Sequence, residues 1–182
     1  MNEQPDFDDA PAKFSQSFTQ QEPLPEEAIA AAMEVLKSAR LHRYSRDSDE
    51  AGQVALLERE YANWQGRRFC LAVTSGGQAI QIALRAVGVA PGDVVLTNAF
   101  TLAPVPGAIA GVGAKSILVE TDKNLTIDID DLKTKASRAK FLLLSHMRGH
   151  LCDMERLMEI AHTNGLTVIE DCAHSMGAHC NG

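Results

Sequence analysis

The feature that most constrains the fold is a regular alternation of short apolar runs and amphipathic stretches after residue 66. Short apolar runs predict strands, and apolar residues recurring at three- and four-residue steps predict helices. The expected strands are 69–73, 94–97, 116–120, 141–145 and 166–170, and the expected helices are 78–87, 105–112, 129–136 and 154–163. Strands joined by helical crossovers form parallel sheets that helices cover on both faces. The sequence therefore predicts an α/β domain of three layers with a mostly parallel sheet.

Three segments of different character make up the chain. Residues 1–22 are acidic and rich in Gln and Ser, which predicts a mobile arm. Residues 23–66 carry two predicted amphipathic helices, which begin near Pro25 and near Asp49. Residues 67–182 form the predicted α/β domain.

Helix ends are marked within this domain. Asp128 and Asp153 precede two of the predicted helices, where a carboxylate can cap the free backbone N–H groups. Gly165 follows the last predicted helix, where glycine adopts the left-handed conformation that ends many helices.

Composition limits the partners and the compartment. The chain has 17 Lys and Arg against 24 Asp and Glu, and its net charge of −7 disfavours nucleic acid and anionic membranes. No apolar run is long enough to span a membrane, and the first residues do not resemble a signal peptide. The four cysteines lack the spacing of a disulfide framework or a CxxC motif. We therefore expect a cytoplasmic protein with reduced thiols that binds neither nucleic acid nor membrane.

A pair of glycines follows the first predicted strand and opens a predicted helix. Gly76 and Gly77 let the backbone approach a ligand closely, and the free N–H groups of a first helical turn favour a phosphate. The same pair could simply form a tight strand-to-helix turn. The stretch is neither a GxGxxG fingerprint nor a P-loop, which argues against a dinucleotide-binding domain.

The last predicted strand ends in two carboxylates, Glu170 and Asp171. Ligands of parallel α/β sheets bind at the carboxyl ends of the strands. A single acid there is more often a helix cap or an ion-pair partner, but here Ala173 and His174 follow Asp171 at fixed spacing. This spacing favours a ligand site.

The histidines and cysteines do not predict a metal site. Cys172, His174, His179 and Cys180 are clustered in sequence, but their spacing fits no common structural zinc pattern. His146 begins at a predicted strand end and is interpreted as a structural or site-lining residue. We expect no metal ligands.

Taken in order, these motifs resemble the DegT/StrS-type sugar aminotransferases, which are fold-type-I pyridoxal-phosphate (PLP) enzymes. The resemblance covers roughly residues 24–182. The stretches that carry it are Ser75-Gly76, Ala79-Ile80, Ala83-Leu84, Pro91-Gly92-Asp93, Ala99-Phe100-Thr101, Gly113-Ala114, Asp122, Asp128, His146-x-x-Gly149, Asp153-Met154 and Val168 to His174.

The resemblance implies the large domain of the fold-type-I enzymes and a set of cofactor contacts. Gly76 and Gly77 would donate backbone N–H groups to the PLP phosphate, and Asp171 would hold the protonated pyridine nitrogen. His174 would reach the phenolic oxygen of the ring, and Ala173 would lie against the ring face.

The chain departs from the family pattern at three points. Gly77 stands where the family usually has a threonine, so a hydroxyl contact to the phosphate is missing. Leu102 stands where an aromatic ring usually stacks on the cofactor, a role that Phe100 could take in part. The lysine that holds the cofactor covalently lies later in the family than Gly182, so no catalytic residue is assigned and the seven lysines are interpreted as surface charges.

The implied activity is transfer of an amino group from an amino-acid donor to a keto-sugar, nucleotide-linked, by a homodimeric enzyme. The chain is expected to be an N-terminal portion that ends before the lysine strand and the small domain, and to be inactive and marginally folded alone. In the implied sheet, 69–73 lacks its neighbours and the strand ending at Asp171 is an edge. Two alternatives remain: a non-catalytic regulatory or assembly homologue, and a PLP-dependent sugar dehydratase in which histidine replaces the lysine.

Overall fold

The computed structural model describes residues 22–43 and 52–179, which fall into two units, Met1–Ala55 and Leu56–Gly182. Apart from its last residue, the predicted arm lies outside the described residues, as does the predicted helix start near Asp49. In the first unit, α1 (Glu26–Ser38) begins directly after Pro25, as predicted, and none of its residues is buried. Helix α2 (Gln53–Trp64) crosses the division between the units.

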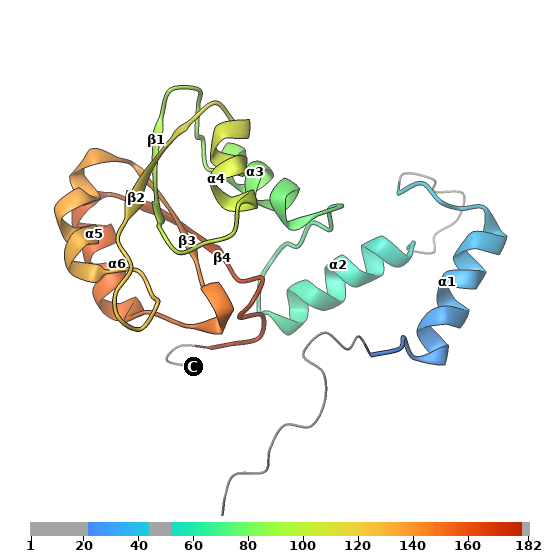
Figure 1. Ribbon diagram of the computed structural model, residues 1–182. Helices are drawn as coiled ribbons and strands as arrows, with labels where there is room; N and C mark the ends of the chain where they lie inside the picture. Colours follow the sequence, from blue (N-terminus) through green and yellow to red (C-terminus); the bar gives the residue numbers. More distant parts are fainter. Residues whose placement is uncertain (1–21, 44–51, 180–182) are drawn as a thin grey trace, which may run out of the picture. The chain divides into compact units, whose positions relative to one another are not determined.

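The second unit contains a sheet of four parallel strands in the order β2-β1-β3-β4 (Figure 1). Its elements are α3 (Gly76–Ala86), β1 (Val94–Asn98), α4 (Pro104–Gly111), β2 (Lys115–Val119), α5 (Ile129–Lys135), β3 (Phe141–Ser145), α6 (Met154–Asn164) and β4 (Thr167–Asp171). This arrangement confirms the predicted α/β class and the parallel sheet. None of the helices in the described part of the chain is long and apolar enough to cross a membrane.

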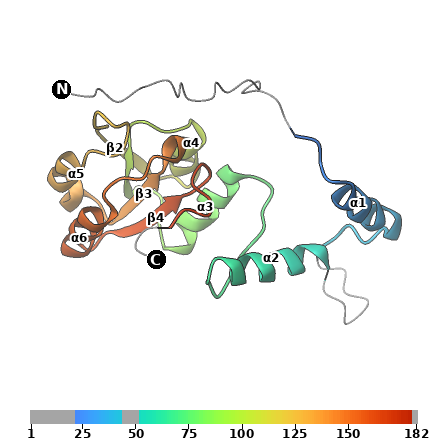
Figure 2. The ribbon, with the colours of Figure 1, turned by 90° about the horizontal axis from the view of Figure 1, so that it is seen from below.

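Helices cover both faces of the sheet, which gives the three predicted layers (Figure 2). On one face, Leu84 of α3 and Ile109 of α4 pack with Leu143 of β3. On the other face, Leu157 of α6 packs with Leu144 of β3. Because successive residues of a strand point to opposite faces, β3 is buried along its whole length and reads as a continuous apolar run.

The connections that follow β1 and β3 run toward opposite edges of the sheet. From β1 the chain passes through α4 to β2 at one edge, and from β3 it passes through α6 to β4 at the other edge. The β1–β3 pairing ends at Thr97 and Leu143, whereas the β3–β4 pairing continues to Ser145 and Asp171. Ligands of open α/β sheets bind where neighbouring strands diverge in this way, outside their carboxyl ends.

The predicted strand at 69–73 is wrong, because this segment forms no strand and pairs with none of the four strands. A strand needs a neighbour to pair its backbone groups. Phe69 and Leu71 accordingly remain 79% and 56% exposed. Two related predictions are confirmed: the segment does not pair with the strands that follow it, and β4 is an edge of the sheet.

The predicted caps are confirmed by their geometry. The Asp128 carboxylate accepts hydrogen bonds from the backbone N–H groups of Asp130 and Asp131, at 2.9 and 3.0 Å. The Asp153 carboxylate accepts one from the N–H of Arg156 at 3.1 Å. Gly165 ends α6 with a φ of +66°, a left-handed conformation that costs glycine little.

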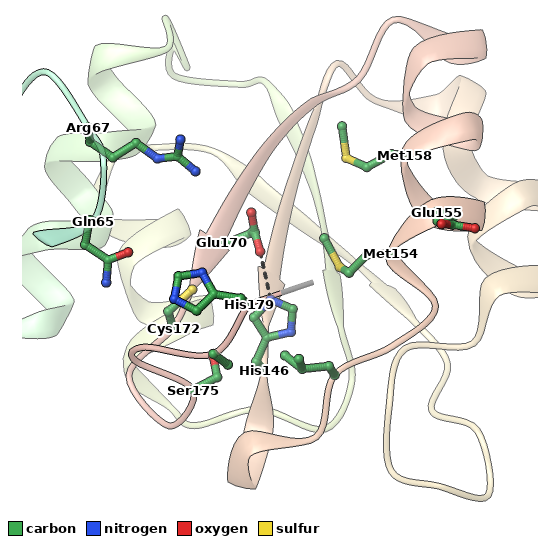
Figure 3. A pocket seen from close by; sticks show the side chains of 12 residues that line it. Gln65, Arg67, His146, Met154, Glu155, Met158, Glu170, Cys172, Ser175 and His179 are labelled. Carbon is green, nitrogen blue, oxygen red and sulfur yellow. Dashed lines mark hydrogen bonds and ion pairs between the residues drawn. The ribbon is translucent and has the colours of Figure 1, made fainter. Parts of the chain in front are cut away.

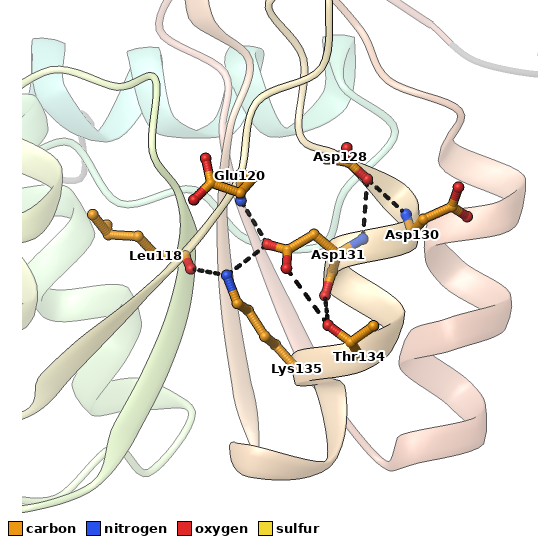
Figure 4. Close-up of polar contacts among 7 residues, drawn as sticks. All are labelled: Leu118, Glu120, Asp128, Asp130, Asp131, Thr134 and Lys135. Atoms are coloured by element: carbon orange, nitrogen blue, oxygen red, sulfur yellow. Dashed lines mark hydrogen bonds and ion pairs between the residues drawn. The ribbon is translucent and has the colours of Figure 1, made fainter.

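A polar cluster ties the first turn of α5 to the end of β2 (Figure 4). The Asp131 carboxylate accepts a hydrogen bond from the backbone N–H of Glu120 at 2.7 Å and pairs with Lys135 at 2.6 Å. The Lys135 ammonium also donates to the carbonyl of Leu118 at 2.9 Å. The Lys135 ammonium holds the pKa of Asp131 below its usual value, so the carboxylate stays charged at neutral pH.

Candidate functional site

The amino end of α3 presents two free backbone donors. Ser75 is the N-cap, and its hydroxyl oxygen accepts a hydrogen bond from the N–H of Gln78 at 3.2 Å. Within the described residues, the N–H groups of Gly76 and Gly77 have no hydrogen-bond partner. Free N–H groups at a helix amino end bind anions, because they carry the positive end of the helix dipole.

This helix end lies beside the connection that leaves β1. A Cβ atom added at Gly77 would lie 3.8 Å from the Cβ of Pro104, the first residue of α4. The same connection contains Thr101, whose buried hydroxyl has no hydrogen-bond partner in the part of the chain that the structure describes, and Leu102, which is 50% exposed. The structure therefore brings the predicted phosphate donors next to the segment that carries the predicted Leu102.

Asp171 lies on the same face of the sheet as α3. It is the last residue of β4, two positions beyond Ile169, which packs against the cluster that contains Ile80 and Leu84 of α3. Residues two apart on a strand point to the same face. One oxygen of the Asp171 carboxylate accepts a hydrogen bond from the Ser145 hydroxyl and the other from the N–H of Ala173, both at 3.2 Å.

Asn98, which the sequence analysis did not single out, joins the carboxyl ends of β1 and β3. Its side-chain oxygen accepts a hydrogen bond from the N–H of Ser145 at 2.9 Å. Its amide nitrogen donates to the carbonyls of Ser145 and Phe100, at 3.0 and 2.8 Å. The sequence carried one signal for Asn98 and Ser145: each is a polar residue at the end of an apolar run that predicts a strand.

His174 follows β4 in a turn, and its orientation is set by a backbone contact. The Nδ1 atom of its ring accepts a hydrogen bond from the N–H of Arg148 at 3.1 Å. A neutral imidazole that accepts at Nδ1 carries its proton on Nε2. His174 can therefore donate a hydrogen bond from Nε2.

Together these groups suit a ligand with an anionic end and a cationic end. The α3 amino end supplies N–H donors for an anion, and Asp171, on the same face, supplies a carboxylate for a protonated nitrogen. His174 adds an N–H donor, its Nε2, near the end of β4.

A cavity of about 440 Å³ lies elsewhere, and none of the five predicted site residues lines it (Figure 3). Met154 and Met158 of α6 line one side. In it, Nε2 of the buried His146 lies 3.0 Å from the Glu170 carboxylate. This hydrogen bond holds the pKa of Glu170 below its usual value. Because side chains alternate along β4, Glu170 faces this cavity while Asp171 faces α3.

Cys172 lies near this pair. Among the described residues, donor atoms of His146, Glu170 and Cys172 lie within 4.8 Å of one another. The His146–Glu170 contact already pairs two of these groups, and burial raises the pKa of the Cys172 thiol, which keeps it neutral. We do not assign a metal to this group, and the expectation of no metal ligands stays a prediction.

Comparison with known proteins gives consistent matches. Residues 24–182 match the DegT/DnrJ/EryC1/StrS aminotransferase family. Over 132 residues the chain is 39% identical to the pleiotropic regulatory protein of Geobacillus stearothermophilus, covering 71% of this chain and 35% of the relative. Over 134 residues it is 39% identical to the dTDP-3-amino-3,6-dideoxy-alpha-D-galactopyranose transaminase of Aneurinibacillus thermoaerophilus, covering 72% and 37%.

Solved structures agree with the sequence matches. The aminotransferase from Psychrobacter cryohalolentis superposes with a TM-score of 0.79 at 25% identity, covering 90% of this chain and 40% of that one. The fold is therefore that of the fold-type-I sugar aminotransferases. The chain spans little more than a third of the length of the curated relatives it matches.

Proposed function

The chain belongs to the DegT/DnrJ/EryC1/StrS aminotransferase family, and we propose that it carries part of the PLP site of an aminotransferase acting on a keto-sugar. Five residues form the proposed contacts to the cofactor: Gly76, Gly77, Leu102, Asp171 and His174. No lysine of this chain stands in the sequence context of the family's cofactor-holding lysine. We therefore propose that these 182 residues do not complete a catalytic cycle alone.

The observation that carries the proposal is that N–H donors suited to an anion and a carboxylate suited to a cation lie on the same face of the sheet. The unpaired N–H groups of Gly76 and Gly77 fit a phosphate, and the Asp171 carboxylate fits a protonated ring nitrogen. PLP carries both groups on one rigid ring. The buried hydroxyl of Thr101, in the adjacent connection, has no hydrogen-bond partner among the described residues and offers a further polar contact.

When bound, PLP supplies an electron-poor ring that accepts the electron pair left when a substrate loses a proton. In our proposal, Asp171 keeps the ring nitrogen protonated by accepting its N–H. His174 would donate from Nε2 to the phenolic oxygen, because its Nδ1 already accepts the N–H of Arg148. Leu102, half exposed ahead of α4, would contact the ring without stacking on it.

The proposed substrates are a nucleotide-linked keto-sugar and an amino-acid donor, and the proposed assembly is a homodimer. The support for the sugar comes from relatives such as the dTDP-amino-sugar transaminase, to which the chain is 39% identical. We propose the cytoplasm as the compartment, in keeping with free thiols at Cys70, Cys152 and Cys172.

A second candidate is a regulatory or assembly homologue that keeps the cofactor fold without the chemistry. The relative from Geobacillus stearothermophilus, which bears the name of a regulatory protein, favours it. Reduction with borohydride in the presence of PLP separates the two in the complete protein. A catalytic enzyme acquires label on one lysine, whereas a binding-only homologue acquires none at a specific site.

The binding site is tested with pyridoxamine 5′-phosphate, which needs no lysine. Gly76 is the first residue of α3, a position that accepts proline, and the extended backbone of Ser75 suits a residue before proline. Gly76→Pro therefore removes one free N–H while keeping the helix. By calorimetry we expect about tenfold weaker binding than in the unchanged chain.

Gly76→Ala is the matched control, because a Cβ added there meets no atom within 4 Å. It should bind as tightly as the unchanged chain. Equal binding by the proline and alanine variants, or no saturable binding by the unchanged chain, would contradict the proposal.

A further inference from the structure

We propose that Asn98 and Ser145 form a positioning device that holds the Asp171 carboxylate in one orientation toward the cofactor ring. The inference rests on the proposed PLP site. It adds two residues from two other strands, neither of which is assigned to contact the cofactor.

Asn98 replaces backbone pairing where the two central strands part. The β1–β3 pairs end at Thr97 and Leu143. Beyond that point, the side chain of Asn98 bonds both the N–H and the carbonyl of Ser145. An asparagine amide offers one acceptor oxygen and two donor hydrogens, and here all three functions are used, the last on the carbonyl of Phe100. Ser145 is therefore fixed relative to β1 although the strands have stopped pairing.

Burial makes this bridge costly to break. Asn98 is 2% exposed and Ser145 is 7% exposed. Backbone groups buried without a partner are strongly unfavourable, so Asn98 is required where it stands. The serine backbone is consequently rigid, and its side chain starts from a defined position.

The Ser145 hydroxyl then orients Asp171. The two residues are direct partners in the β3–β4 pairing, so their side chains point to the same face, the one that α3 covers. The hydroxyl donates to one carboxylate oxygen and the N–H of Ala173 to the other. Both donors are neutral, so they fix the carboxylate without cancelling its charge, and each oxygen keeps a lone pair for a ligand. A ligand then binds a carboxylate that is already oriented, so binding does not have to immobilise the Asp171 side chain.

The test compares Ser145→Thr with Ser145→Val, two side chains of equal shape of which only threonine has a hydroxyl, alongside Ser145→Ala. All three keep the backbone groups that Asn98 binds. We expect alanine and valine to weaken binding of pyridoxamine 5′-phosphate by about five- to tenfold. Threonine should retain most of the affinity. Binding of inorganic phosphate, which needs only the α3 amino end, should stay unchanged in every variant.

A double-mutant cycle distinguishes positioning from a general structural effect. In an Asp171→Ala background, Ser145→Ala should cost no further affinity, because Ser145 acts only through Asp171. A loss that persists in this background, or equal affinities of the threonine and valine variants, overturns the proposal.

A measurement without ligand keeps the inference separate from the proposed function. Three-bond NMR couplings report the side-chain rotamer of Asp171 in the unliganded chain. We expect one rotamer in the unchanged chain and in Ser145→Thr, and averaging over several in Ser145→Ala. If the unchanged chain binds no pyridoxamine phosphate, the proposed function fails, while the rotamer result still supports or overturns the positioning device.

Discussion

At Gly77 this chain lacks a side-chain contact to the proposed phosphate that the family pattern provides. Its N–H is free, but it lacks the hydroxyl that threonine contributes at this position in the family pattern. The space for a side chain is present, since an added Cβ would lie 3.8 Å from Pro104, an ordinary contact distance. Nothing in the packing of the α3 amino end requires glycine here.

Gly77→Thr should therefore strengthen binding of pyridoxamine 5′-phosphate by about three- to tenfold, through one added hydrogen bond to a charged group. Calorimetric titration measures the change. Gly77→Val has the same shape without the hydroxyl and should give no gain. If valine helped as much as threonine, the effect would come from stiffening the helix start, not from a phosphate contact.

Residues of the site differ in how far the sequence revealed them. Gly76, Gly77, Asp171 and His174 could be predicted as site residues because they stand at element ends in motifs that resemble those of the family. Asn98 and Ser145 were not, because their contact joins residues 47 positions apart and depends on which strands are neighbours. Strand order is a property of the folded sheet, and a single sequence carries little direct signal for it.

At the scale of elements, a predicted element forms where the groups that stabilise it are present, which lie next to it in sequence for a helix and on a neighbouring strand for a strand. The helices of the second unit were predicted to within a few residues, since caps such as Asp128 and Asp153 lie next to the turns they stabilise. The four strands between them were predicted equally well, since each finds a neighbour. The apolar run 69–73 has the composition of a strand but no neighbour, and instead the N–H of Ala72 donates to Glu58 at 2.7 Å.

The cap of α6 provides the prediction at this scale. Asp153→Ala removes the acceptor for the N–H of Arg156, and we expect the free energy of unfolding to fall by about 1 kcal/mol. Urea unfolding at neutral pH measures it, with an unchanged slope showing that only stability has moved. Asp153→Ser keeps a capping oxygen and should recover most of the loss. A serine variant as unstable as the alanine variant would show that the cap contributes little.

For the molecule as a whole, the sequence predicted the fold class of the second unit but not what covers its exposed apolar residues and its open sheet edge. Phe69 and Leu71 stay exposed, and β4 is an open edge. Exposed apolar segments and open edges favour association with other chains. The chain alone therefore stays predicted to be marginally folded. A small free energy of unfolding is sensitive to pH.

The carboxylates set the expected response to pH. The pKa values of Asp131 and Glu170 are lowered in the folded chain, by Lys135 and by His146, from ordinary values of 3.8 and 4.5. The unfolded chain therefore binds protons at a higher pH than the folded chain does. The stability that these groups add is complete above the ordinary values and is lost as the pH falls through the lowered ones.

We therefore expect the free energy of unfolding to be steady from about pH 7 to pH 5 and to fall below about pH 4.5. Asp131→Asn and Glu170→Gln should each be less stable than the unchanged chain at neutral pH, because the contact of Asp131 with Lys135 and the hydrogen bond of Glu170 with His146 are weakened. Their curves should converge with that of the unchanged chain in acid, where the native carboxylates are protonated as well.

Asp131→Asn should show the larger loss of stability, because the Asp131 side chain is 22% exposed against 47% for Glu170, and solvent screens the contact of Glu170 more. Urea unfolding at a series of pH values gives all three curves, and curves that stay parallel down to about pH 3 would show that neither pair contributes to the acid sensitivity.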